Sequence, residues 1–521
     1  MKVDNAIEPR SLSTASAGAL HHQPNGAISV TDSLLLYALE LTAFLVLLAL
    51  YKKVGRPMSV FLPTPAGKMM ILGAGTFTVF AIALLVALRS RTVRRRFLPT
   101  LALNVGVLAV LFLTAEITIR ALASPSPSGP YFGDKLLLPR SWEHESARQR
   151  AVLTEAAVRH SYLAPDADLG WSIRPSARSK DYNLEFELAY LRQLQRSSPG
   201  DMKAGSGPRV SATDDSVYQS SAEGLRSPRA GMSFAALPHR HRIALVGDSF
   251  TFGLEVRYEE TWGQQLETAL GGDYQILNFG VDGYGVDQAY LHFRRDVIQW
   301  HPDVVILGVV SDDLHRTMCV YGFLCFPGSE MPFSKPRFVV VGDSLQLLPR
   351  PANSSDSVFA KRTIAELPLI QYDHDFDPYE WDWHSYDHSY AIRYLLSRYR
   401  RWSPPRPAVD NKALASVNAA LFRAFVRDVR AMHATPVVLF FPSRSELPST
   451  GEGPFVGRDV LQQSGVPFID TTPCITRLPQ ADRFVVLHFS PKANGAVVSC
   501  LREQLPELFG ARRQALPSNG G

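Results

Sequence analysis

Apolar residues are concentrated near the start of the chain in three long stretches. They cover residues 34–50, 69–88 and 97–115, and each is close to the ~20 residues that a helix needs to cross the hydrocarbon core of a membrane. The pattern therefore predicts about three transmembrane helices within residues 29–121. Residues 1–28 are rich in Ser, Ala, His and Gly and show no apolar period, which predicts a disordered tail ahead of the membrane region.

The pattern changes to that of a folded α/β domain from residue 241 onward. Short β-branched runs alternate with helical stretches such as 261–269, 288–300 and 414–433. Buried strands that alternate with helices form a parallel sheet covered on both faces, so we expect an α/β domain over residues 241–510. The predicted strands are residues 242–246, 275–278, 303–307, 435–441 and 466–470.

Two parts of the chain do not fit this alternation. Residues 122–240 begin with a Ser/Pro-rich linker and then mix short apolar pieces with Ser-, Gly- and Pro-rich loops, so we interpret them as a linker and a segment ahead of the domain. About 120 residues separate the third and fourth predicted strands, which is too many for an ordinary crossover. We therefore expect an insertion or lid around residues 316–410, and a disordered tail at residues 511–521.

Charge limits the classes of partner and indicates a topology. The net charge of +5 is small for 521 residues, and the basic residues are scattered apart from one cluster, so nucleic acid is not an expected partner. The cluster lies between the second and third apolar stretches, where positive charge tends to stay in the cytoplasm. This orientation sends the chain after Arg120 to the far side of the membrane. The cluster consists of Arg89, Arg91, Arg94, Arg95 and Arg96.

All four cysteines lie after the apolar region. Cys319 and Cys325 are close in sequence, and Cys474 and Cys500 both lie near the end of the predicted domain. This spacing suggests two local disulfides, which require an oxidising compartment and agree with an extracytoplasmic domain. Unpaired buried thiols are the alternative.

A serine follows directly after the first predicted strand. Residues 243–246 are Ile-Ala-Leu-Val, and Gly247, Asp248 and Ser249 come next, ahead of a helical stretch. Open α/β sheets bind ligands at the carboxyl ends of their strands, and a Ser at a helix start lies beside backbone N–H groups that can stabilise an oxyanion. Ser249 is therefore a candidate nucleophile, and the alternative is a turn in which Ser249 only caps the helix.

Residues 242–253 resemble the first sequence block of the SGNH (GDSL-type) hydrolase superfamily, in which this Ser is the nucleophile. The resemblance implies a flavodoxin-like three-layer α/β/α fold with a parallel sheet, and no cofactor. In the second block of the family a Gly after the second strand donates its N–H to the oxyanion, and Gly283 within residues 278–285 matches it. Residues 162–171 also look like the segment that precedes the nucleophile strand in membrane-linked bacterial members.

The third block departs from the family pattern. The family has an Asn after the third strand whose side chain donates to the oxyanion, whereas this sequence has Asp312 there, within residues 308–313. An ionised carboxylate only accepts hydrogen bonds, so it cannot stabilise an oxyanion unless it is protonated. We therefore expect an oxyanion hole made of the Ser249 and Gly283 N–H groups, with the role of Asp312 left open.

The last block of the family carries the general base in an Asp-x-x-His run. His488 is followed by Phe-Ser-Pro and a stretch of small residues, which looks like this block. Val485 occupies the place of the Asp that normally orients the imidazole. Three alternatives follow: Asp482 reaches back to His488, another carboxylate substitutes, or Ser249 and His488 work as a dyad.

The predicted insertion contains a cluster of aromatic, acidic and histidine residues. A metal site is conceivable from such side chains, but no spacing matches a known set of ligands, and we do not expect a metal there. Aromatic residues interleaved with polar ones suit a lid or a surface that stacks on sugars equally well. The cluster comprises His374, Asp375, Asp377, Trp381, Asp382, Trp383, His384, Asp387 and His388.

These features together predict a multi-pass membrane protein with an extracytoplasmic ester-processing domain. Ser249 would attack an ester carbonyl, His488 would take its proton, and water or a sugar hydroxyl would release the acyl group, as in an esterase or an O-acyltransferase. The location suggests small acyl esters of cell-surface glycans as substrates. The alternative is a catalytically silent domain that binds a polysaccharide or an envelope partner, and Asp312 and Val485 motivate it. The oligomeric state is not predicted.

Overall fold

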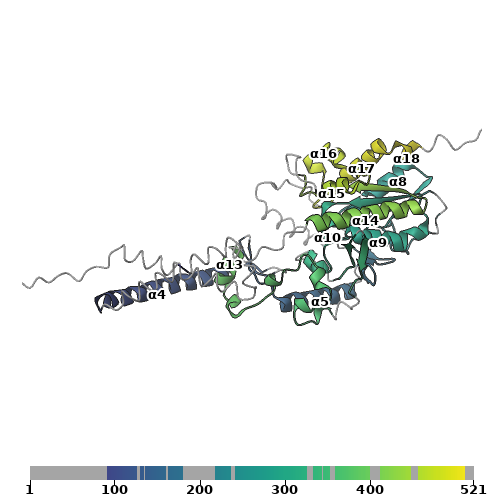
Figure 1. Cartoon of the computed structure of the whole chain (residues 1–521). Coiled ribbons are helices and arrows are strands. Elements are labelled where there is room, and N and C mark those ends of the chain that lie inside the picture. The colour runs from purple at the N-terminus through teal and green to yellow at the C-terminus, as the bar shows by residue number, and fades with distance from the viewer. Residues whose placement is uncertain are drawn as a thin grey trace, which may run out of the picture. The chain divides into compact units, whose positions relative to one another are not determined.

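The computed structural model describes most of the chain after residue 90 and divides the chain into two compact units, residues 1–118 and 119–521. Figure 1 draws the described elements as ribbons, with labels on several helices, and the other residues as a grey trace. The described residues are Gly75, 91–125, 129–133, 135–159, 162–179, 218–235, Leu237, 241–325, 333–342, 344–351, 358–398, 411–447 and 456–510.

One long helix, α4 (Arg91–Leu122), carries the third predicted apolar stretch. Its apolar part, Pro99–Leu122, has a mean hydropathy of 2.0 and is long enough to cross a membrane. Only 11% of this apolar window is buried, so α4 is not the core helix of a soluble domain. Within the described residues it is the one helix of this length and composition. The predicted stretches 34–50 and 69–88 lie outside the described part, which holds a single residue of the second.

The predicted parallel sheet is confirmed. Its strands are β7 (His241–Val246), β8 (Tyr274–Asn278), β9 (Val304–Val309), β12 (Thr435–Phe440) and β13 (Ile469–Asp470). Their order across the sheet is β13-β12-β9-β7-β8, and every neighbouring pair is parallel. Every residue of β9 is buried, as expected of a strand that is covered on both faces. The order places β7, which leads to Ser249, between two neighbours.

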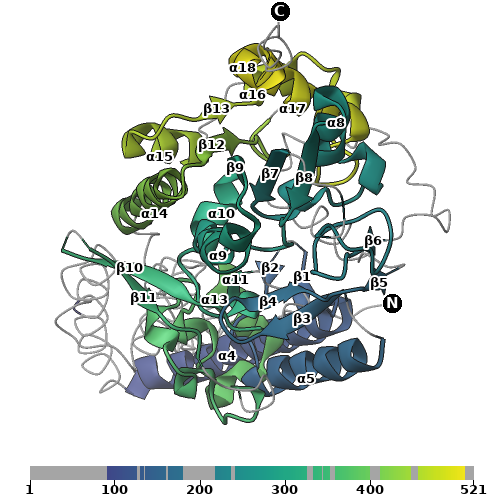
Figure 2. The ribbon, with the colours of Figure 1, turned by 90° about the vertical axis from the view of Figure 1, so that its right-hand side faces the viewer.

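Helices cover both faces of the sheet, as Figure 2 shows. The helices α8, α17 and α18 pack together on one face, and α9, α10, α14 and α15 pack together on the other. The short helix α7 joins the sheet to the site. The bounds are α7 (Ser249–Phe252), α8 (Trp262–Leu270), α9 (Val286–His292), α10 (Ser311–Arg316), α14 (Asn411–Ala431), α15 (Val456–Ser464), α16 (Thr472–Thr476), α17 (Pro491–Gln504) and α18 (Pro506–Gly510).

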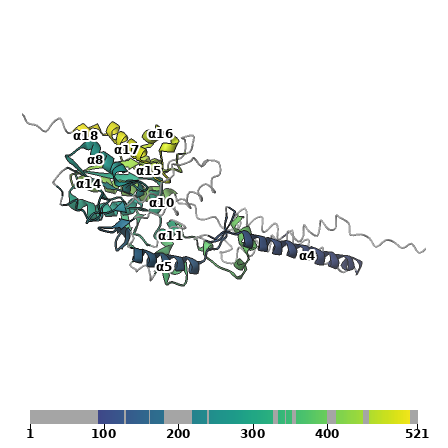
Figure 3. The same cartoon turned by 180° about the vertical axis from the view of Figure 1, so that it is seen from behind.

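The insertion between β9 and β12 packs on a helix from the segment ahead of β7. Trp142 of α5 (Trp142–Arg159) contacts Phe323 and Trp381, with ring centroids 5.9 and 6.2 Å apart. Figure 3 shows α5 on the side of this unit away from α8 and α17. After α10, the insertion contains α11 (Gly322–Cys325), the hairpin of β10 (Arg337–Val341) and β11 (Ser344–Leu348), four 3-10 turns between residues 364 and 388, and α13 (Tyr390–Arg398).

The rest of the segment ahead of β7 covers the loops at the carboxyl end of the sheet. Trp171 and Tyr218 belong to one buried cluster with Phe252, which ends α7, and with Tyr284. The Trp171 indole donates to the carbonyl of Asp282 at 2.8 Å, and the Tyr284 hydroxyl donates to the carbonyl of Trp171 at 2.6 Å. This segment forms three small antiparallel pairs, β1 (Tyr131–Phe132) with β2 (Lys135–Leu136), β3 (Leu163–Asp166) with β4 (Gly170–Ile173), and β5 (Arg178–Ser179) with β6 (Tyr218–Gln219).

Candidate active site

Ser249 lies where β7 ends, at the first position of α7. Asp248 caps this helix by accepting the Phe250 N–H at 2.9 Å. Gly247 has a φ of 151°, and a Cβ there would lie 2.3 Å from Thr251 Oγ1, so the turn requires glycine. The tight turn fixes the Ser249 hydroxyl at the carboxyl end of a central strand, and the residue is 3% exposed.

His488 reaches Ser249 from the loop ahead of α17. Its Nε2 lies 2.8 Å from Ser249 Oγ, although the two residues are 239 positions apart in the chain. The loop is a tight turn, because the Val485 N–H donates to the His488 carbonyl at 2.9 Å. Ser490 then caps α17 by accepting the N–H of Ala493 at 3.1 Å. The imidazole is therefore placed to take the proton of the Ser249 hydroxyl.

A carboxylate meets the other nitrogen of the same ring. Glu255 Oε1 lies 2.7 Å from His488 Nδ1. The carboxylate also accepts the backbone N–H groups of Val486 at 2.6 Å, Leu487 at 2.9 Å and His488 at 3.2 Å. Glu255 thus orients both the imidazole and the loop that carries it, which is the position of the acid in a Ser-His-acid triad.

Asp482, the predicted partner of His488, does not contact the ring. Its carboxylate pairs with Lys492 at 2.9 Å, and its carbonyl accepts a hydrogen bond from the Ser490 hydroxyl. Both groups are therefore engaged with the start of α17. Of the alternatives left open by the sequence, the structure places a different carboxylate, Glu255, beside the imidazole. No sequence motif points to Glu255.

The charges around His488 set its affinity for a proton. Burial of the ring is the largest single influence and lowers the pKa, but the charge and the hydrogen bond of the Glu255 carboxylate both favour the imidazolium, and the net change is a rise. The pKa of His488 therefore lies above its usual 6.5, and Asp282 and Asp248 act weakly in the same direction. A ring with a raised pKa is a stronger base for the Ser249 hydroxyl, but it also needs a higher pH to lose its own proton.

Two backbone N–H groups are available for an oxyanion. Within the described part of the chain, neither the Ser249 N–H nor the Gly283 N–H donates to another group. Gly283 has a φ of 74° and lies in the turn after β8. Val281 of the same turn donates its N–H to the Gly247 carbonyl at 3.1 Å. This hydrogen bond joins the turn that contains Gly283 to the turn of residues 247–249. Both donors therefore lie at one edge of the sheet.

The third block contacts the nucleophile turn through residues other than Asp312. Asp312 is exposed on α10, and its side chain makes no hydrogen bond to any residue that the structure describes. Asp313 is buried and pairs with Arg316 at 2.6 Å, and Arg316 also contacts Asp248 at 3.3 Å. Burial and repulsion from Asp248 raise the pKa of Asp313 well above its usual range, while Arg316 opposes both effects. Arg316 therefore lies between two buried carboxylates, one of which caps α7.

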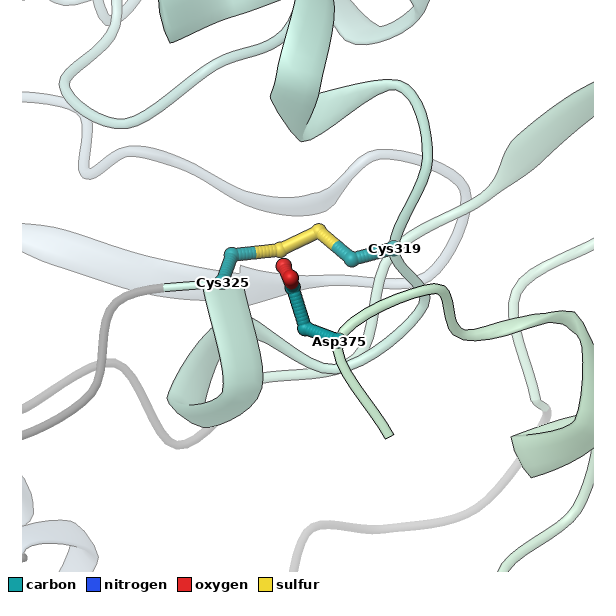
Figure 4. Close-up of side chains that lie close together, drawn as sticks. All are labelled: Cys319, Cys325 and Asp375. Atoms are coloured by element: carbon teal, nitrogen blue, oxygen red, sulfur yellow. A yellow bond between two sulfur atoms is a disulfide. The ribbon is translucent and has the colours of Figure 1, made fainter. Parts of the chain in front are cut away.

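The structure joins the cysteines in the two pairs that their spacing suggests, Cys319 with Cys325 and Cys474 with Cys500. The Cα atoms are 6.2 and 6.0 Å apart, which suits a disulfide. Figure 4 shows Asp375 of the insertion beside the first pair. These three residues form a group of potential metal ligands, but a sulfur in a disulfide offers no thiolate.

Several members of the aromatic and acidic cluster in the insertion have structural contacts. Asp377 caps a 3-10 turn by accepting the Tyr379 N–H at 3.0 Å, and Asp387 accepts the His384 N–H at 2.9 Å. The Trp383 indole donates to the Arg140 carbonyl at 2.8 Å. These contacts give structural roles to Asp377, Asp387 and Trp383, which the sequence pattern could assign either to a lid or to a sugar-binding surface.

Comparisons with protein-family models and with curated proteins find no match. Solved structures match about half of the chain. They include TesA, with 12% identity, 51% of this chain and 99% of that chain covered, and a TM-score of 0.27. A protein described as lipolytic and of the G-D-S-L family, from Desulfitobacterium hafniense DCB-2, has 13% identity, with 50% and 100% covered and a TM-score of 0.25.

A catalytic mutant of Axe2, an acetylxylan esterase from Geobacillus stearothermophilus, has 12% identity, with 53% of this chain and 96% of that chain covered and a TM-score of 0.28. These two proteins are described as a lipolytic protein of the G-D-S-L family and as an acetylxylan esterase. With identities of 12 to 13% and TM-scores of 0.25 to 0.28, the matches assign no chemistry to this chain.

Proposed function

We propose that this chain is a serine ester hydrolase or O-acyltransferase, and that α4 holds it at a membrane. The observation that carries the proposal is the chain of hydrogen bonds from Ser249 through His488 to Glu255, at 2.8 and 2.7 Å. A buried imidazole that is bonded to a hydroxyl on one side and to a carboxylate on the other is the arrangement that activates a serine.

The reaction proceeds through an acyl-enzyme. Ser249 Oγ attacks the ester carbonyl carbon while His488 Nε2 takes its proton, and the electron pair of the C=O bond moves to the oxygen. The N–H groups of Ser249 and Gly283 stabilise this oxyanion, and Glu255 stabilises the imidazolium. When the C–O bond breaks, the alcohol leaves with the proton from His488. A water or an acceptor hydroxyl, deprotonated by His488, then releases the acyl group.

The substrate class follows from the location that we propose. Arginines precede the apolar part of α4, and the domain after α4 contains two disulfides. Both features favour a domain outside the cytoplasm. The esters available there include acylated glycans of the cell surface, so we propose small acyl groups on such glycans. Release by water gives an esterase, and release by a sugar hydroxyl gives an O-acyltransferase.

The further helices predicted at 34–50 and 69–88 would make the anchor multi-pass.

A fluorophosphonate probe tests the nucleophile, because it labels only an activated serine. The full chain in detergent should react with the probe, and Ser249→Ala should abolish the reaction. Ser344→Ala is a matched control, because Ser344 is exposed on β11 and far in sequence from the site residues. Labelling that persists in Ser249→Ala would refute the role of Ser249.

A catalytically silent domain is the second candidate, and the third block favours it. Asp312 occupies the sequence position of an amide donor to the oxyanion hole, and loss of one such donor costs about 3 to 4 kcal/mol of transition-state stabilisation. If the wild type neither reacts with the probe nor hydrolyses p-nitrophenyl acetate, the domain is a binding module for a polysaccharide or an envelope partner.

A further inference from the structure

The acid beside His488 adopts a backbone conformation that needs support. Glu255 has a φ of 67°, in the left-handed region that a residue with a side chain seldom adopts. It follows α7 closely, where the Gly253 and Leu254 N–H groups both donate to the Ser249 carbonyl, at 3.0 and 3.1 Å. A residue persists in such a conformation only when its surroundings hold it there.

A tyrosine from outside the hydrolase-like sheet contacts this backbone. The Glu255 N–H donates to Tyr218 Oη at 2.9 Å. Tyr218 belongs to β6, in the segment ahead of the nucleophile strand, and it is 5% exposed. One hydroxyl from this segment thus binds the acid on its backbone, while the carboxylate of the acid binds His488.

The ring of Tyr218 is held on several sides. Phe252 of α7 lies 5.5 Å from it and Tyr162 lies 6.3 Å from it, measured between ring centroids. The Arg226 guanidinium, which is fully buried, lies 4.7 Å from the centre of the Tyr218 ring. A ring packed in this way keeps its hydroxyl at a fixed position.

We propose that Tyr218 is a positioning residue for catalysis, which holds Glu255 in the conformation that directs its carboxylate to His488 Nδ1. The described residues 218–235, which contain Tyr218, are then a part of the active site rather than a spacer between the membrane and the enzyme. The inference rests on the proposed function, because it assigns Glu255 the role of the acid.

Tyr218→Phe tests the proposal, because it removes the hydroxyl and keeps the ring. The Glu255 N–H then loses its hydrogen bond to the Tyr218 hydroxyl and the backbone relaxes, so the carboxylate moves away from Nδ1. We expect kcat/KM for p-nitrophenyl acetate to fall about tenfold, with KM almost unchanged. The acid limb of the pH profile should move to lower pH, because the carboxylate no longer raises the pKa of His488 as strongly.

Tyr162→Phe is the matched control. Its hydroxyl belongs to the same aromatic cluster but donates to the Gln219 carbonyl, at 3.2 Å, and not to Glu255. This variant should keep both the rate and the pH profile of the wild type. If Tyr162→Phe shifts the pH profile as much as Tyr218→Phe does, the effect comes from the cluster as a whole and the proposal is wrong.

NMR measures the pKa of His488 without any enzymatic assay. The full chain is labelled with 13C-histidine and titrated in detergent. The His488 signal is identified by its loss in His488→Gln. We expect Tyr218→Phe to lower the pKa of His488, and to lower it no further in the Glu255→Gln background. An unchanged pKa in folded Tyr218→Phe, or an equal fall in the Glu255→Gln background, would overturn the proposal. A wild type without esterase activity would instead overturn the proposed function and leave this titration valid.

Discussion

At the scale of single residues, the site contains one carboxylate that the sequence motifs do not include. Glu255 lies six positions after Ser249, on the loop that leaves α7, and not ahead of His488. Its carboxylate binds three successive backbone N–H groups as well as His488 Nδ1. These hydrogen bonds hold the carboxylate in place, so it can serve as the acid even though it comes from a different loop.

Glu255→Gln should lower kcat/KM for p-nitrophenyl acetate by about a thousandfold. The amide N–H of Gln would donate to Nδ1, so the ring proton would be on Nε2. A protonated Nε2 cannot accept the proton of Ser249. The acid limb of the residual activity should move to lower pH. Without the carboxylate, burial remains and lowers the pKa of His488, so the ring stays neutral to a lower pH.

Asp482→Asn is the control for this prediction. Asp482 and Lys492 form an ion pair between side chains that are 33% and 66% exposed, and such pairs contribute little. The rate should stay within about twofold of the wild type. A loss as large as that of Glu255→Gln would mean that Asp482, and not Glu255, supports the histidine during the reaction.

The sequence names most of this site but not its acid. Ser249, Gly283 and His488 stand in local motifs, because each depends on the turn that follows one strand or precedes one helix. Glu255 depends on how the loop after α7 folds back onto the histidine loop, which involves residues more than 230 positions apart. The available signal is a Glu two positions after Gly253, the residue that caps the end of α7, and it resembles an ordinary surface loop.

At the scale of elements, the strands are predicted well because they are continuous apolar runs. Residues 242–246 became β7 and residues 435–441 became β12, with ends that agree within one residue. The insertion is recognised only by its length. Its hairpin, its 3-10 turns and its packing on α5 depend on contacts between distant aromatic residues, which no local period encodes.

Replacement of the Cys474–Cys500 pair by two alanines should lower the free energy of unfolding by about 3 kcal/mol. The disulfide joins α16 to α17 and closes a loop of 26 positions that contains His488. Its removal frees the unfolded chain and loosens the two ends of the histidine loop, so the rate should fall as well. Urea unfolding followed by near-UV circular dichroism measures the first effect, and p-nitrophenyl acetate hydrolysis measures the second.

The Cys319–Cys325 pair is the matched control. It closes a loop of only 6 positions, so the entropy that it removes from the unfolded chain is smaller, and its loss should cost about 2 kcal/mol. It lies outside the histidine loop, so the rate should change little. A greater loss of stability or rate here than at Cys474–Cys500 would contradict this explanation.

At the scale of the whole molecule, α4 begins with a group of arginines and continues as an apolar helix ahead of the α/β domain. Arginines are concentrated ahead of its apolar part, whereas Arg120 is the one basic residue in its last turn. This asymmetry predicts that the start of α4 stays in the cytoplasm and that the end of α4 lies outside. The disulfides support the same orientation, because they form in oxidising compartments. The location of the domain in turn decides which esters can reach Ser249.

Reporter fusions measure this orientation. A reporter enzyme that folds only outside the cytoplasm should be active when fused after residue 130 and inactive when fused after Arg96 if α4 crosses the membrane between these points, as we propose. Replacement of Arg94, Arg95 and Arg96 by Glu should reduce the activity of the first fusion, since the charges that hold the start of α4 inside are lost. An Arg120→Glu variant should leave it unchanged or raise it. Activity of the reporter after Arg96 alone would place the Ser249 domain in the cytoplasm, where neither the disulfides nor cell-surface glycans fit, and the substrate would have to be an intracellular ester.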